Sequence, residues 1–322
     1  MYKILKELIT LKGNESKSTE SVESNEPVRS AEPVAVENEP NDKAHDVRTY
    51  VPLGHYHSPI PSIEYIRKNH QRIFAPLPKS IPGIDLREKH QLELVRNFKQ
   101  YYDTQPFQAA KTYPLRYFFE NPSYSYLDGI FLHSMIRHFK PARIIEVGSG
   151  YTTCLILDTK EMFLEGQLEL TCIEPYPDLL ASLLRQDDLQ TIQLLAKDLQ
   201  EVDVAVFSSL QKNDILLIDS THVARVGSDV NFAFFEMLPR LTSGVLIHFH
   251  DVFYPFEYPM DWIYENRGWS ELYVLRAFLQ FNSDFEITLF SSYLMNFHQD
   301  LISALMPLSL KNAGGNIWLR RK

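Results

Sequence analysis

The stretch of sequence that decides the fold is RIIEVGSGYTT, residues 143–153. Arg143–Val147 is short, apolar and rich in β-branched side chains, which is typical of a buried strand. Gly148 and Gly150 then permit a tight turn and a close approach of the backbone to a ligand. The residues that follow, 152–158, are typical of a helix. A strand, a glycine turn and a helix in this order predict an α/β sheet that binds a ligand at its carboxyl edge.

The same alternation of strand and helix continues outward from this unit. Further strands are expected at 170–174, 191–196, 214–220, 244–251, 285–290 and 316–320. Helices are expected at 86–102, 127–139, 177–185, 199–210, 229–241 and 270–281, with Phe232, Phe235 and Leu238 of the fifth facing inward. This order predicts a seven-stranded, mostly parallel sheet with helices on both faces.

Composition and charge exclude several classes of protein. The chain has 322 residues, of which 44% are hydrophobic and 23% charged, as in ordinary globular domains. Its net charge of −9 argues against nucleic-acid binding by broad phosphate neutralisation. Its two cysteines suggest a reducing compartment, so we expect a cytoplasmic protein. No apolar run is long enough for a membrane span.

Most of the acidity lies in one N-terminal stretch. Residues 13–46 contain nine acidic and three basic residues, and no Leu, Ile, Phe, Tyr, Trp or Met. Such a segment cannot bury enough apolar surface to offset its ordering entropy, so it is predicted to be a disordered acidic linker. Residues 1–12 before it are predicted to be a short amphipathic segment, which is either a docking or membrane-surface helix or a frayed tail.

Residues 47–124 are rich in proline and aromatic side chains. Nine tyrosines and phenylalanines in 101–126 would not be left in water, so this region is expected to be an ordered extension that wraps the sheet domain of residues 125–322.

A carboxylate after the second strand strengthens the ligand-site prediction. A complete dinucleotide-binding motif would place a third glycine at Thr153, so the pattern at Gly148 and Gly150 is incomplete. Glu174 ends the second strand, 24 residues after Gly150, where a carboxylate can accept both hydroxyls of a ribose. Together these residues suggest a nucleoside-containing cofactor, with a purely structural turn as the alternative.

The region from about 125 to 322 resembles the class I S-adenosylmethionine-dependent methyltransferases, with a Rossmann-like sheet. It is most similar to the small-molecule O-methyltransferase branch called methyltransferase family 24. The stretches that carry the resemblance are IIEVGSGYTTCLILD, TCIEPYP, LLIDSTHV, SDVNFAFFEMLPRL and GVLIHFHDVFYPFEYP. The resemblance implies that the last strand inserts antiparallel to the others.

The resemblance also implies roles for particular residues. Glu146, Gly148 and Gly150 would cradle the methionine part of S-adenosylmethionine, Glu174 would hold its ribose, and Asp198 would lie near its adenine. Asp219 would lie near the methyl group or a metal ion. The chain departs from many relatives at Thr152 and Thr153, where they carry glycine.

A second group of polar residues follows the fourth and fifth strands. His248 and His250 point to the same face of their strand, and Asp219 and Asp251 end neighbouring strands. A hydroxyl acceptor must lose a proton, so His250 or His222 is the candidate base and Asp251 would orient it. His248 is more typical of a packing residue.

A divalent metal ion is the alternative means of activating the acceptor. The resemblance to metal-dependent relatives makes Asp219 and Asp251 the candidate metal ligands. Those relatives often carry Asn or Asp where this chain has Val252, so whether a metal binds stays open.

The sequence thus predicts an S-adenosylmethionine-dependent methyltransferase that acts on an oxygen of a small molecule or glycan. Residues 253–269, with their aromatic side chains, are expected to form an acceptor wall or to cover the sheet edge. Two alternatives remain, a nucleotide-linked oxidoreductase on a similar sheet and a non-catalytic cofactor-binding scaffold. The sequence selects neither the acceptor nor the oligomeric state.

Overall fold

The computed structural model describes residues 50–322. The predictions for residues 1–12 and 13–46 therefore lie outside the described residues. The chain divides into two units, Met1–Pro52 and Leu53–Lys322, and the fold below is that of the second. No helix among the residues that the structure describes is long and apolar enough to cross a membrane.

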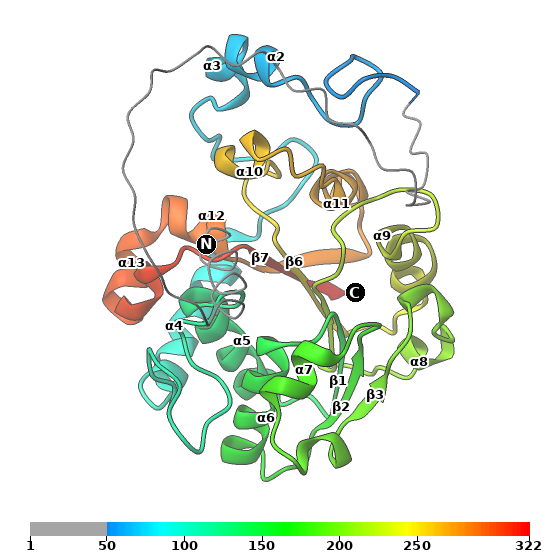
Figure 1. The fold of residues 1–322 in the computed structure, drawn as a ribbon. Helices are drawn as coiled ribbons and strands as arrows, with labels where there is room; N and C mark the ends of the chain where they lie inside the picture. Colours follow the sequence, from blue (N-terminus) through cyan, green and yellow to red (C-terminus); the bar gives the residue numbers. More distant parts are fainter. Residues whose placement is uncertain (1–49) are drawn as a thin grey trace, which may run out of the picture. The chain divides into compact units, whose positions relative to one another are not determined.

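Seven strands form one sheet in the order β3-β2-β1-β4-β5-β7-β6. Figure 1 labels β1, β2 and β3 as neighbours, and β7 beside β6. Strands β1 to β5 are mutually parallel, while β7 lies between β5 and β6 and is antiparallel to both. The predicted fold class and the inserted antiparallel strand are therefore confirmed. The strands are β1 (Arg143–Val147), β2 (Glu169–Ile173), β3 (Gln193–Leu195), β4 (Ile215–Ile218), β5 (Leu246–His250), β6 (Phe285–Phe290) and β7 (Asn316–Arg321).

The central strands β4 and β5 are buried along their whole length, which explains their near-continuous apolar sequences. Helix α5 packs against both α4 and α6. The α-helices of this unit are α2 (Ile63–Lys68), α3 (His70–Ile73), α4 (Glu88–Tyr102), α5 (Tyr126–Phe139), α6 (Tyr151–Phe163), α7 (Asp178–Leu183), α8 (Ala205–Ser208), α9 (Asp229–Phe232), α10 (Met260–Tyr264), α11 (Glu271–Leu279), α12 (Ser291–Phe297) and α13 (Gln299–Leu305).

The structure differs from the prediction in two of the helices. The helix expected at 199–210 is a 3₁₀ turn followed by the short α8, because Val202 is extended between them. The helix expected at 229–241 continues from α9 into a π-helical segment, Ala233–Met237. The π turn shifts the helix face, so Phe234 is buried and Phe235 is 63% exposed, contrary to the prediction.

The aromatic region before α5 is ordered and packs into the core. Tyr117 and Tyr124 are almost completely buried. The guanidinium of Arg116 pairs with buried Asp158 of α6 at 2.8 Å and also with Asp188. The backbone N–H groups of Arg116 and Tyr117 donate to the same Asp158 carboxylate. This charged network fixes the extension against α6.

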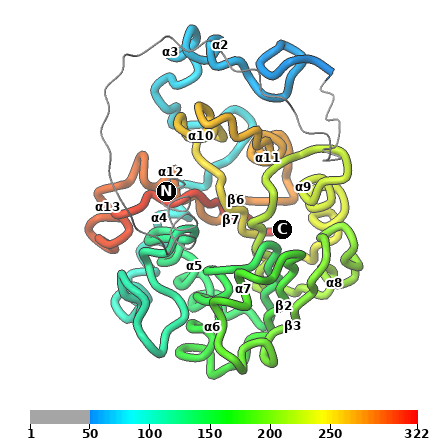
Figure 2. The backbone as a smooth tube through the Cα atoms, viewed as in Figure 1, coloured from blue at the N-terminus to red at the C-terminus, as the bar shows by residue number. Residues whose placement is uncertain are grey.

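Helices α12 and α13, between β6 and β7, were not predicted from the sequence. The chain here leaves one edge strand, forms the two helices and returns as β7, a path that the backbone tube of Figure 2 follows in orange and red. α13 contacts α4, so this insertion and the N-terminal extension pack against each other.

Candidate active site

The loop after β1 has the conformation that its glycines suggest. Gly148 has a φ of 79°, and a Cβ built there would lie 1.8 Å from the backbone oxygen of Asp219. Only glycine therefore fits between the ends of β1 and β4. Gly150 has an extended backbone, and a Cβ there would come no closer than 3.8 Å, to Leu179. Gly150 leaves space in the cleft and is not required by the backbone.

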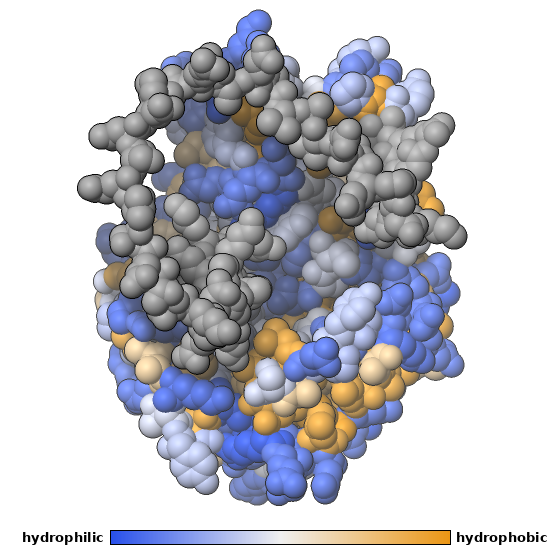
Figure 3. All heavy atoms as spheres, viewed as in Figure 1, coloured by the Kyte–Doolittle hydropathy of each residue, from blue (hydrophilic) through white to orange (hydrophobic). Residues whose placement is uncertain are grey.

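A cleft opens over this loop at the carboxyl edge of the sheet. Glu174 lies at its rim, and its two carboxylate oxygens accept the backbone N–H groups of Ser149 at 3.1 Å and Tyr176 at 2.8 Å. The space-filling view of Figure 3 shows apolar side chains gathered near α7, whose exposed Leu179 is among the cleft residues. The cleft is lined by Ser123, Tyr124, Gly148, Ser149, Gly150, Tyr151, Thr152, Glu174, Leu179 and Asp219.

Two of the predicted cofactor residues do not line this cleft. Glu146 is fully buried beneath the loop, where its carboxylate accepts the hydroxyls of Thr152 and, at 2.5 Å, Thr153. Thr153 also accepts the N–H of Gly150 at 3.2 Å, so its hydroxyl helps to hold the loop at the start of α6. Burial raises the pKa of Glu146 to about 7. Asp198 is exposed and stays a prediction.

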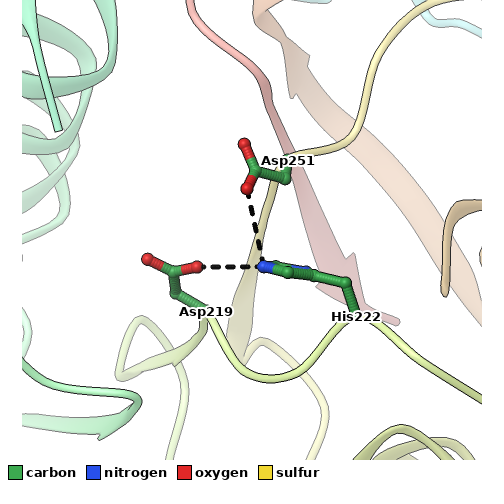
Figure 4. A group of neighbouring side chains, drawn as sticks. All are labelled: Asp219, His222 and Asp251. Atoms are coloured by element: carbon green, nitrogen blue, oxygen red, sulfur yellow. Dashed lines mark ion pairs between the residues drawn. The ribbon is translucent and has the colours of Figure 1, made fainter. Parts of the chain in front are cut away.

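Asp219, His222 and Asp251 meet beside the cleft, as Figure 4 shows. Asp219 follows β4, His222 lies on the loop after it, and Asp251 follows β5. The Nε2 atom of His222 lies 3.3 Å from Oδ1 of Asp219 and 3.5 Å from Oδ2 of Asp251. His222 and Asp251 have φ values of 60° and 55°, in the left-handed region that non-glycine residues rarely occupy. The backbone is thus strained where these side chains converge.

The sequence analysis missed the carboxylate on the other side of His222. Nδ1 of His222 lies 2.8 Å from Oε2 of Glu271, the first residue of α11, and both side chains are buried. Burial alone would lower the pKa of His222, but its bonds to Asp219 and Glu271 raise the pKa well above the ordinary value. A histidine with both ring nitrogens facing carboxylates is suited to be an imidazolium. The only feature of the sequence that could have pointed to Glu271 is its place in the first turn of a predicted helix.

His250 has a different environment from that of His222. Its Nε2 lies 3.6 Å from Oδ1 of Asp251, and its Nδ1 has no hydrogen-bond partner among the described residues. Burial lowers the pKa of His250, and the nearby Asp251 and Asp219 outweigh this and raise it. His248, on the same face, packs edge-on against Trp318, and burial lowers its pKa well below the ordinary value. That packing agrees with the structural role expected of His248.

The group formed by Asp219, His222 and Asp251 has the chemistry of a metal site. One donor atom from each residue lies within 4.8 Å of the others. Glu271 holds Nδ1 of His222 and so directs Nε2 toward the two carboxylates, an arrangement common among metal-binding histidines. Two carboxylates and one imidazole fit a transition-metal ion better than Mg²⁺.

The segment 253–269 places aromatic rings over this group. The ring of Trp269 lies 4.6 Å from that of His222, and Trp262 packs against Trp269 at 5.2 Å. Arg267 stacks on Trp262 at 4.1 Å. Tyr254, in contrast, turns inward and packs on Phe290 of β6. Part of the segment can therefore form a wall beside the site, while the rest covers the sheet.

Comparison with known proteins shows which family part of this chain resembles. Residues 145–252 match the model of a family described as a methyltransferase domain. An uncharacterized protein of Archaeoglobus fulgidus is 30% identical over 175 residues, which are 53% of this chain and 78% of that protein. Neither the oxidoreductase nor the scaffold alternative finds support in these matches.

The comparison also found solved structures of methyltransferases. The S-adenosylhomocysteine-bound methyltransferase PaMTH1 of Podospora anserina has 14% identity and a TM-score of 0.41, over 86% of this chain and 100% of its own. The O-methyltransferase TomG of Streptomyces achromogenes, involved in tomaymycin synthesis and bound to S-adenosylmethionine, has 14% identity and a TM-score of 0.39. That match covers 80% of this chain and 96% of TomG.

Proposed function

This chain belongs to the class I S-adenosylmethionine-dependent methyltransferases, and on that premise we propose that it methylates a hydroxyl oxygen of a small molecule or glycan. The main support for the proposal is that Asp219 belongs to two groups of residues. Asp219 lines the cleft that ends at Glu174 and also belongs to the group around His222. The cleft and a set of proton-handling side chains therefore adjoin at one residue.

The cleft residues fit the cofactor. The close approach at Gly148 and the space beside Gly150 leave backbone exposed for the methionine portion. Each carboxylate oxygen of Glu174 accepts one backbone N–H and keeps a lone pair for a ribose hydroxyl. Glu146 would act indirectly, by holding Thr152 and Thr153 at the start of α6. Bound S-adenosylmethionine supplies a methyl group that its sulfonium charge already activates.

His250 is the base that we propose for the acceptor hydroxyl. His222 is a poorer choice, because carboxylates face both of its ring nitrogens and leave none for the acceptor proton. His250 has one ring nitrogen without a partner among the described residues, while Asp251 faces the other. A neutral imidazole in that position can accept the acceptor proton, and Asp251 can stabilise the imidazolium that results. His222 then orients Asp219 and Asp251.

A metal ion is the alternative to this role of His222, because Nε2 must be unprotonated to coordinate one. Asp219, His222 and Asp251 would hold it, and it would lower the pKa of the acceptor hydroxyl. The tryptophans of the segment 253–269 would contact the acceptor by stacking on a ring or on a sugar face.

A screen of hydroxyl-bearing acceptors with methyl-labelled S-adenosylmethionine tests the proposal. The screen is run with and without EDTA. Each product is then broken into fragments to identify the atom that carries the labelled methyl group. His250→Ala should lower turnover about 100-fold or more if His250 is the base. His55→Ala, at a half-buried loop position that does not line the cleft, is the matched control and should keep full activity. Labelling of nitrogen or carbon alone would overturn the oxygen assignment, and full turnover in His250→Ala would remove His250 as base.

A further inference from the structure

Tyr124 lies between the cofactor cleft and the proposed base. It lines the cleft together with Gly148 and Asp219. Its ring centroid is 5.0 Å from that of His250 and 6.2 Å from that of His248. Tyr124 comes from the N-terminal extension, outside the matched methyltransferase-domain region, and no sequence motif pointed to it. It is thus a side chain of the extension that contacts both parts of the candidate active site.

The hydroxyl of Tyr124 is buried and has no hydrogen-bond partner among the described residues. A buried phenol without a partner loses its interaction with water and gains nothing in return, so such groups are uncommon in folded proteins. Burial, together with the charge of Asp128, raises the pKa of Tyr124 well above its ordinary value. The group therefore stays a neutral O–H that can both donate and accept.

Neighbouring side chains hold the backbone of Tyr124 in position. The side chain of Asn121 accepts the N–H of Tyr124 at 2.7 Å and donates to its carbonyl at 2.7 Å. The hydroxyl of Tyr117 donates to the same carbonyl at 2.7 Å. A Cβ on Gly129 would lie 2.1 Å from that hydroxyl, so α5 leaves room for this bond only with glycine there. Tyr124 is therefore held in place without any ligand.

We propose that Tyr124 contacts the methyl-bearing sulfonium end of the cofactor through its hydroxyl and positions His250 through its ring. Methyl transfer requires the sulfur, the methyl carbon and the acceptor oxygen to align. The methyl group must then be on the side of the cofactor that faces the base, and Tyr124 is the side chain that borders both the cleft and His250. A phenol oxygen can accept a weak hydrogen bond from the polarised methyl C–H groups. The inference rests on the proposed function.

Binding measurements with Tyr124→Phe test the hydroxyl. Isothermal titration with S-adenosylmethionine and with S-adenosylhomocysteine gives two affinities for each variant. Because only the first ligand carries the methyl and the charge, Tyr124→Phe should weaken it by about 2- to 5-fold more than the second. Tyr126→Phe is the matched control, since that hydroxyl bonds Glu120 at 2.9 Å, and should change neither affinity. Equal loss for the two ligands, or no loss, would overturn the contact.

Tyr124→Leu tests the positioning of His250. The ring ¹⁵N signals of His250, assigned by their absence in His250→Gln, should shift or broaden in Tyr124→Leu and stay in place in Tyr124→Phe, which keeps the ring. Unchanged signals in Tyr124→Leu would refute the positioning role. If Tyr124→Leu does not fold, the Tyr124→Phe affinities still decide the first part.

Failure of this inference can be told apart from failure of the proposed function. A wild-type chain that binds neither ligand contradicts the methyltransferase site itself. A wild-type chain that binds both, with Tyr124→Phe indistinguishable from it, contradicts only the contact assigned to Tyr124.

Discussion

His222 and Glu271 form a buried pair, with Nδ1 of the histidine 2.8 Å from Oε2 of the carboxylate. The two residues are 49 positions apart in the sequence. One lies on the loop after β4 and the other begins α11, so the pair joins the sheet edge to the helix that follows the aromatic segment. On its other side, the same imidazole faces Asp219 and Asp251.

Glu271→Gln should destabilise the protein by about 3 kcal/mol, because it removes one partner of a buried charged pair. Glu271 raises the pKa of His222 above the value of the unfolded chain. Stabilisation from this histidine is therefore complete below about pH 6.5 and is lost as the pH rises through the folded-state pKa. The difference between wild type and variant should be largest where Glu271, whose pKa burial raises, is ionised while His222 is protonated, and it should shrink in the alkaline range. Urea unfolding at several pH values measures it.

The control for this pair is Glu265→Gln, at an exposed carboxylate that pairs with Arg267. It should change the unfolding free energy little, as surface ion pairs usually do. A Glu271→Gln variant as stable as Glu265→Gln across the pH range would contradict the role given to the buried pair.

Glu174→Gln should weaken S-adenosylhomocysteine binding about 10- to 100-fold, since charge-assisted hydrogen bonds to the ribose would be lost. Calorimetry gives the affinity. Glu169→Gln, at the opposite end of β2 from Glu174, exposed and paired with Arg143, should bind like wild type. An unchanged affinity in Glu174→Gln would mean that the ribose lies elsewhere.

Glu146→Gln should stabilise the protein above neutral pH. The pKa of Glu146 rises from 4.5 to about 7 on folding because the carboxyl group is buried. The folded protein keeps a proton that the unfolded chain loses, so the contribution is full below pH 4.5 and is lost as the pH rises to 7. Glutamine has no such dependence, so the variant should gain up to about 3 kcal/mol at pH 8. Urea unfolding at pH 5 and pH 8 checks this, and a parallel loss of stability in both proteins would refute it.

Gly148→Ala and Gly150→Ala should behave differently although the residues are two apart. A Cβ at Gly148 would overlap the backbone oxygen of Asp219, so that variant should lose about 2 kcal/mol or more of stability. A Cβ at Gly150 meets no protein atom closely, so that variant should keep its melting temperature and lose cofactor affinity. Equal melting temperatures for the two variants would show that the loop relaxes around the added methyl group.

Asp251→Asn tests the metal site. Titration of the wild type with Mn²⁺, followed by electron paramagnetic resonance, should show bound ion, and Asp251→Asn should bind it about 10-fold or more weakly. Asp261→Asn, at an exposed position on α10, should bind like wild type. Absence of bound ion in the wild type would leave the His222 site as a proton-holding group alone.

The sequence by itself determined the sheet and the glycine loop after β1. β1, β6 and β7 lie where the apolar runs predicted them, and Gly148, Gly150 and Glu174 all line the cleft. These features are local, because an apolar strand pattern and a glycine in the left-handed conformation both depend on residues that are neighbours in the sequence. The same local rule failed at Phe235, where a π-helical turn displaced the predicted face.

Only the tertiary structure decided which distant side chains complete the site. Glu271 reaches His222, and Tyr124 reaches both the cleft and His250, because helix packing and the ion network of Arg116 bring separate segments to one edge of the sheet. Glu146 lies in the stretch that resembles the family. It is buried beneath the loop, however, and its carboxylate faces Thr152 and Thr153. Such contacts depend on long-range packing, which leaves no periodic signal in the sequence.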